Sequence, residues 1–212
     1  MRDCTPGEML RSGSFYLLYF MMTLVTASGL MLAAQLKPIA VTYGYDKYAL
    51  FGGFTVLTLT LSVNQILNGS ARPFFGWVSD RIGRYDTMAI VFVLEAITIV
   101  ALTLLVARPF WFIAISALMF FAWGDIYSLF PAAIADIFGS KHATTNYGIQ
   151  YTAKGVGSIL AGPGAALLMA AANSWIPVFW CAVACNVIAA ALAVLWLKPR
   201  VARMVKEQST IP

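Results

Sequence analysis

Long apolar stretches separated by short polar segments dominate the chain. Six such stretches, each close to the ~20 residues that cross a hydrocarbon core, lie at residues 14–36, 49–77, 87–107, 111–130, 145–170 and 176–197. The segments between them carry turn residues, such as Lys37 with Pro38 and Asn173 with Ser174. The stretches lack the strict alternation of a membrane barrel strand. The pattern therefore predicts an all-α membrane protein, with residues 1–212 as a single domain of six transmembrane helices.

Composition supports this class and excludes several others. The chain is 60% hydrophobic and 11% charged, whereas a soluble domain has about 25% charged residues. The net charge of +5 is not gathered into a basic patch interleaved with aromatics, so no nucleic-acid partner is expected. The three cysteines and one histidine show no metal-ligand spacing, and no nucleophile elbow or phosphate loop is present. We therefore expect no enzyme, no catalytic or metal-binding residues and no cofactor.

The basic residues predict how the helices are oriented. Of the first, third and fifth connections, the first holds Lys37 and Lys47, the third holds Arg108 and the fifth holds no basic residue. Nine lie in the N-terminal segment, the second and fourth connections and the C-terminal tail: Arg2, Arg11, Arg81, Arg84, Lys141, Lys198, Arg200, Arg203 and Lys206. Since cytoplasmic segments are enriched in Lys and Arg, both termini are expected in the cytoplasm.

Two further cations, Arg72 and Lys154, fall inside predicted helices. Lys154 lies about nine residues into the fifth helix, roughly 14 Å deep at 1.5 Å per residue. A cation at a helix centre costs roughly 2.5–3.5 kcal/mol on insertion scales, so such residues are usually functional. Polar residues recur one turn away on the same two helices and are expected to line a cavity: Asn64, Asn68, Gln150 and Ser158. Two cations facing one cavity suit a small dicarboxylate.

Other interpretations of these positions stay open. Arg72 is nearer a helix end, where its side chain can extend to the interface. Trp123 and Tyr127, one turn apart in the fourth helix, suit helix packing as well as a binding site. Glu95 and Asp125 are also inside predicted helices and could form structural ion pairs with the cations. A stripe of small residues on the fifth helix predicts close helix packing: Ala153, Gly157, Ala161 and Ala165.

The second connection carries a motif. It reads G-x-x-x-D-R-x-G-R and consists of Gly76, Asp80, Arg81, Gly83 and Arg84. This resembles the signature that transporters of the major facilitator superfamily carry between their second and third helices, where it acts in the conformational gate. Members normally have twelve helices in two six-helix halves, each half a pair of inverted three-helix repeats. Six predicted helices therefore correspond to one half of that fold.

A closer resemblance covers nearly the whole chain. Residues 30–40, 68–80, 123–131 and 138–158 resemble the C-terminal half of the bacterial oxalate:formate antiporters, and the last two stretches are the most specific. That family exchanges oxalate for formate across the bacterial inner membrane. Its C-terminal half supplies one arginine and one lysine to the oxalate site, with aromatic residues around them. The resemblance implies that Arg72, Lys154, Trp123 and Tyr127 bind substrate.

The expected function is therefore transport of small carboxylates by oxalate:formate exchange, with this chain as the C-terminal half or a truncated form. One alternative is another monocarboxylate or dicarboxylate transporter of the same superfamily. A second alternative is an inactive membrane fragment that needs a partner half. The expected partners are oxalate and formate, the lipid bilayer, and either a separate N-terminal six-helix half or a second copy.

Overall fold

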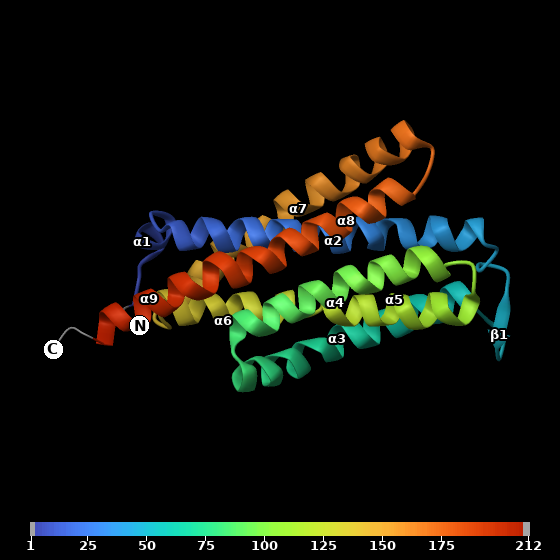
Figure 1. The fold of residues 1–212 in the computed structure, drawn as a ribbon. Coiled ribbons are helices and arrows are strands. Elements are labelled where there is room, and N and C mark those ends of the chain that lie inside the picture. Colours follow the sequence, from blue (N-terminus) through green and yellow to red (C-terminus); the bar gives the residue numbers. More distant parts are fainter. Residues whose placement is uncertain (1–2, 210–212) are drawn as a thin grey trace.

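The computed structural model describes the backbone of residues 3–209 and their side chains except those of residues 51, 205 and 207–209. Long helices run side by side in an elongated bundle (Figure 1). In order they are α1 (Pro6–Leu10), α2 (Gly13–Thr42), α3 (Val56–Ile82), α4 (Arg84–Leu105), α5 (Pro109–Trp123), α6 (Ile126–Phe138), α7 (Ala143–Ala172), α8 (Ile176–Leu192), the π-helical turn η1 (Ala193–Leu197) and α9 (Lys198–Ser209). Helices α1 and α9 lie at the same end of the bundle (Figure 1).

Helices α3 and α7 lie at the edges of the bundle. Helix α2 packs on α7 and α8, α4 packs on α5 and α8, and α3 packs on α5. Helix α6 lies between α3 and α7 and contacts both. The core between the helices is apolar and includes Leu18, Phe92 and Phe130, all fully buried. The predicted all-α class is confirmed.

Five of the helical segments are long and apolar enough to cross a membrane: Gly13–Thr42, Arg84–Leu105, Pro109–Phe138, Ala143–Ala172 and Ile176–Met204. Helix α3 is 27 residues long but is not among them. Its polar residues, Asn64, Gln65, Asn68 and Arg72, lower its hydropathy. The second predicted span, residues 49–77, is therefore represented by a long helix of the bundle that carries several polar side chains.

A short β-hairpin stands where the second apolar stretch was expected to be helical. Strands β1 (Ala49–Phe51) and β2 (Phe54–Thr55) pair antiparallel. Gly52 and Gly53 join them with φ angles of +55° and +85°, values that glycine adopts at no steric cost. A Gly-Gly pair at both central positions is typical of a two-residue hairpin turn. The helix therefore begins at Val56 and not at residue 49, and the boundary predicted from hydropathy alone is wrong.

The first membrane helix also differs from its predicted range. It was expected to end before Lys37 and Pro38, yet α2 continues through both residues to Thr42. Proline lacks a backbone donor, but it is tolerated in membrane helices when neighbouring groups satisfy the freed carbonyls. The residues after it hold the helix in the core, since Ile39 and Ala40 are buried.

The fourth predicted helix is broken in the middle. Helix α5 ends at Trp123 and α6 begins at Ile126, with Gly124 and Asp125 between them. A Cβ built on Gly124 would lie 2.5 Å from the carbonyl oxygen of Asn68 and 2.7 Å from the Cβ of Ala71. Only glycine therefore permits α3 to approach this break so closely. The same transmembrane segment extends to Phe138, eight residues beyond the expected end at 130.

Helix α7 is buried along a single stripe, which consists of Asn146, Gln150, Ala153, Gly157, Ala161 and Ala165. The predicted close packing of its small residues is confirmed, because a Cβ on Gly157 would lie 3.0 Å from the carbonyl oxygen of Thr23 in α2. Only 17% of the apolar window of α7 is buried, against 61% for α2. The remainder of α7 is therefore a broad open face on one side of the bundle.

Candidate anion-binding site

Two cations from different helices converge on one tyrosine ring. The guanidinium carbon of Arg72, on α3, lies 4.6 Å from the ring centroid of Tyr127 on α6. The Nζ of Lys154, on α7, lies 5.0 Å from the same centroid. The two positive groups are consequently no more than about 10 Å apart. Residues 82 positions apart in sequence meet because α6, which carries Tyr127, packs between α3 and α7.

Further aromatic rings extend from Tyr127. Trp123 meets it edge to face at 6.4 Å, and Tyr151 lies 6.4 Å away on α7. The Nζ of Lys154 donates a hydrogen bond of 3.1 Å to Tyr151 Oη, and Tyr147 packs on Tyr151 at 5.7 Å. The sequence analysis did not single out Tyr147 or Tyr151. The signal was available, since the two tyrosines stand one turn apart and Tyr151 precedes Lys154 by three residues.

Trp123 packs between helices and also contacts Tyr127. Its indole is 8% exposed and fills the space above Gly29 of α2, where any added Cβ would overlap the ring. Its Nε1 is buried without a hydrogen-bond partner among the described residues. A buried donor without an acceptor is rare and costly. Trp123 thus fixes the break between α5 and α6 against α2, which sets the position of Tyr127.

Three of the four residues expected to line a cavity lie in helix interfaces instead. Asn68 Nδ2 donates to the carbonyl oxygen of Phe120 at 3.0 Å, and Asn64 Oδ1 accepts from Ser116 on α5 at 3.3 Å. Gln150 is fully buried, with its Nε2 3.7 Å from a methionine sulfur of α2.

Only Ser158 is exposed, and its hydroxyl donates to the carbonyl oxygen of Gly155 at 2.7 Å. The structure therefore places Asn64, Asn68 and Gln150 in helix interfaces and Ser158 on the exposed part of α7. Residues four apart on a helix are offset by about 40°, so a polar stripe turns from one face to the next. Polar side chains within a membrane bundle also satisfy one another across helices, a use that spacing does not distinguish from cavity lining.

Neither central cation has a carboxylate partner among the residues that the structure describes. The two buried acids, Glu95 and Asp125, form no ion pair with either cation. Ser28 of α2 donates to Glu95 Oε1 at 3.2 Å and accepts from Asn186 of α8 at 2.7 Å. Both carboxylate oxygens of Asp125 are buried and without a hydrogen-bond partner in the described part of the chain. The alternative of a structural ion pair at Arg72 or Lys154 is not found.

The five motif residues lie at the junction of α3 and α4: Gly76, Asp80 and Arg81 are in the last turns of α3, Gly83 joins the helices and Arg84 begins α4. Gly83 has a φ of +97°, so it ends one helix and begins the next in a conformation that favours glycine. Arg84 forms a hydrogen-bonded ion pair with Asp136 near the end of α6, and its Nη2 lies 3.7 Å from Asp80. Arg81 stacks over the ring of Trp77 at 4.0 Å. Gly76 is partly buried with open space around it. The Arg84–Asp136 contact ties the motif to the helix that carries Tyr127.

Comparisons with known proteins agree with this architecture. Residues 7–211 match the family profile of the Major Facilitator Superfamily. An oxalate:formate antiporter of Oxalobacter formigenes is 38% identical over 207 residues, which is 97% of this chain and 47% of that protein. An uncharacterized MFS-type transporter of Escherichia coli K12, YhjX, is 28% identical over 159 residues, 74% of this chain and 38% of the relative.

A third relative is an uncharacterized 38 kDa protein of Thermoproteus tenax, 30% identical over 181 residues, 80% of this chain and 44% of that protein. The chain spans less than half the length of each of these relatives. The resemblance inferred from the motif at Gly76 to Arg84 is confirmed, as is the fold class built on it. A profile match over nearly the whole chain establishes that this membrane protein belongs to the Major Facilitator Superfamily.

Proposed function

We propose that this chain is the C-terminal half of a carboxylate transporter that exchanges oxalate for formate, and that Arg72 and Lys154 bind the carboxylates. One observation carries the proposal: two membrane-embedded cations without carboxylate partners among the described residues converge on the ring of Tyr127. Within this chain Arg72 is exposed and Lys154 is partly buried, and a cation at membrane depth is costly unless it is paired. A small anion supplies the missing charge.

The geometry suits a small dianion better than a single charge. Each carboxylate of oxalate pairs with one cation, and at ~4 Å with an effective dielectric of about 20 each pair contributes about 4 kcal/mol before desolvation. The Arg72 guanidinium offers a planar two-donor fork to a carboxylate. Trp123 and Tyr127 pack against the faces of the substrate and exclude water, and Tyr151 holds the lysine by its hydroxyl.

The similarity to a protein named an oxalate:formate antiporter supports the substrate class. Transport in this superfamily requires two halves that rock against each other around a central site. The open face formed by α3 and α7 then meets the second half. We propose an N-terminal six-helix half for this role, because two copies of this chain would place four cations around one cavity. We also propose that the protein lies in a bacterial inner membrane with both termini on the cytoplasmic side, as the distribution of Lys and Arg predicts.

The proposal is tested by uptake of radiolabelled oxalate into proteoliposomes preloaded with formate. The chain is assayed alone and together with a candidate N-terminal half, and Lys154→Ala is compared with Lys141→Ala, which removes an exposed lysine of the α6–α7 connection. We expect saturable uptake that Lys154→Ala abolishes and Lys141→Ala retains. Uptake of another carboxylate with no competition from oxalate would favour the alternative transporter. Uptake that survives Lys154→Ala would refute the assigned site.

A further inference from the structure

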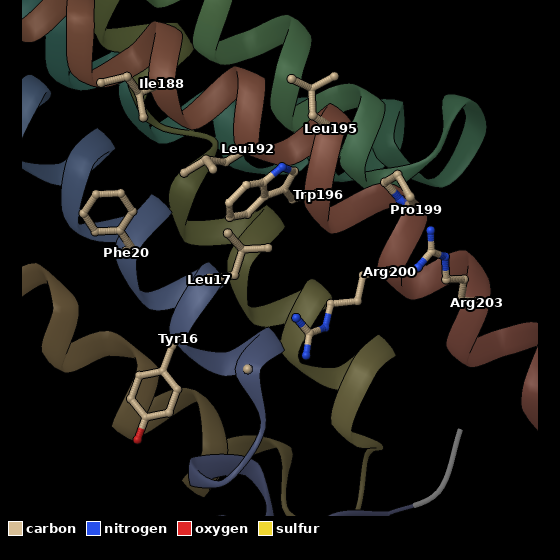
Figure 2. Close-up of a pocket in the computed structure, with 11 residues that line it drawn as sticks. Tyr16, Leu17, Phe20, Ile188, Leu192, Leu195, Trp196, Pro199, Arg200 and Arg203 are labelled. Atoms are coloured by element: carbon tan, nitrogen blue, oxygen red, sulfur yellow. The ribbon is translucent and has the colours of Figure 1, made fainter.

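A groove of about 820 Å³ lies between the first turns of α2 on one side and the end of α8, η1 and the first turns of α9 on the other (Figure 2). It lies at the end of the bundle that holds α1 and α9, and none of the predicted substrate residues lines it. One wall is formed by Leu17 and Phe20 of α2, and the other by Ile188, Leu192 and Leu195. These side chains make the long part of the groove apolar.

One end of the groove is cationic. Arg200 and Arg203 of α9 line it, and Figure 2 shows the Arg200 side chain reaching from α9 toward α2. A Cβ built on Gly13 would lie 2.8 Å from an Arg200 guanidinium nitrogen, so the guanidinium lies directly against the first turn of α2. The first turn of a helix carries partial positive charge. Two positive groups are thus brought together, an arrangement that an anion stabilises.

No carboxylate in the described part of the chain neutralises these arginines. The neighbouring Lys198 differs, because its Nζ binds Asp86 of α4 at 2.7 Å. Both arginines are exposed. The positive charge at the groove is therefore available to a ligand, while that of Lys198 is already paired.

Aromatic side chains mark the depth of this cationic end. Tyr16 and Trp196 line the groove next to it and are 59% and 64% exposed. In membrane proteins Trp and Tyr are enriched at the level of the lipid headgroups, with purely apolar residues deeper in the hydrocarbon. Phe20 and Ile188 follow on the deeper side of the groove (Figure 2). The groove therefore has arginines at one end and the apolar Phe20 and Ile188 toward the other, as a phospholipid has a charged headgroup and an apolar acyl chain.

We propose that this groove binds one anionic phospholipid. The phosphate contacts Arg200 and Arg203 at the first turn of α2, and an acyl chain lies along Leu17, Phe20 and Leu192. The lipid bridges the first and last transmembrane helices, which Gly13 allows by leaving room for the guanidinium. The assignment is independent of the proposed transport function, since it concerns a separate surface.

The test is lipid retention by the purified chain in detergent, followed by native mass spectrometry with phosphatidylglycerol and phosphatidylcholine of equal chain length. We expect phosphatidylglycerol to be preferred. At about fivefold per basic residue near a headgroup, Arg200→Gln and Arg203→Gln each reduce that preference about fivefold. Lys198→Gln removes the same charge from the same helix and leaves the preference unchanged. Circular dichroism confirms that each variant retains its helices.

A second variant tests the geometry without changing any charge. Gly13→Ala displaces the Arg200 guanidinium, a flexible side-chain end, and is expected to lower the preference with no loss of fold. Equal retention of the two lipids, or equal losses in Lys198→Gln and Arg200→Gln, would overturn the proposal. So would displacement of the lipid by equimolar glycerol phosphate, which would reveal a phosphate site without a lipid site.

Discussion

Replacing Lys154 with glutamine should change the selectivity of the site between oxalate and formate. The lysine and Arg72 lie within 5.0 Å of the Tyr127 ring centroid, so oxalate can place one carboxylate on each cation. Formate has a single carboxylate and binds one cation at a time. The substitution removes one charged contact from oxalate, while formate keeps the contact to Arg72.

The expected size of this effect follows from the contact that is lost. A hydrogen bond to a charged group contributes about 1.5–3 kcal/mol, which corresponds to a loss of oxalate affinity of roughly 10- to 150-fold. The loss of formate affinity should be less than about threefold, because Arg72 still offers its two-donor fork. The ratio of the two dissociation constants therefore shifts toward formate by at least about threefold.

Isothermal titration calorimetry of the purified protein with each anion measures both constants. Lys141→Gln serves as the control, since the Lys141 side chain is exposed and its backbone N–H donates to Asp3. The reasoning is refuted if oxalate and formate lose affinity equally, or if neither changes. Equal losses would mean that Lys154 shapes the helix packing and does not bind a second carboxylate.

Three other perturbations follow from the same structure. Gly29→Ala forces a Cβ into the indole of Trp123 and should lower the unfolding free energy by about 1–3 kcal/mol, seen as a lower thermal midpoint. Gly164→Ala is the control and should be neutral, because its added Cβ makes only a 3.5 Å contact. Equal thermal midpoints for the two variants would contradict this. Glu95→Gln retains a hydrogen-bond partner for Ser28 and should leave the unfolding free energy nearly unchanged. Glu95→Leu leaves buried polar groups unpaired and should lower the unfolding free energy by about 1–3 kcal/mol. An unchanged unfolding free energy in Glu95→Leu would show that this hydrogen-bond network contributes little to stability. Exchange of an oxalate dianion for formate moves net charge, so transport by a reconstituted full assembly should respond to membrane potential, and potential-independent exchange would count against oxalate:formate exchange.

Several features of the site were readable from residue type and position. Arg72 and Lys154 stood out because a cation in an apolar helix is expensive, a cost that does not depend on the fold. Trp123 and Tyr127 were assigned through the family resemblance, not through spacing. Whether these four residues bind substrate remains a prediction. Their grouping around Tyr127 is an observation that the sequence pattern alone did not contain.

Other expectations failed for identifiable physical reasons. Hydropathy averages over many residues, so it did not resolve the turn at Gly52 and Gly53 or the break at Gly124. The polar stripe on α3 was assigned to a cavity, yet Asn68 meets a backbone carbonyl of α5. A buried amide satisfied by a neighbouring helix and an amide facing a substrate have the same sequence signature.

The sequence by itself determined that this protein is a helical membrane protein of a known superfamily. The length and hydropathy of its apolar stretches and the charged motif between two of them are local properties of the sequence. The tertiary structure alone decided which polar groups meet. It placed α6 between α3 and α7, which brings Arg72 and Lys154 to one ring, and it set Arg200 against Gly13. Such contacts depend on the angle and offset at which helices pack, and those are set by side chains far apart in sequence.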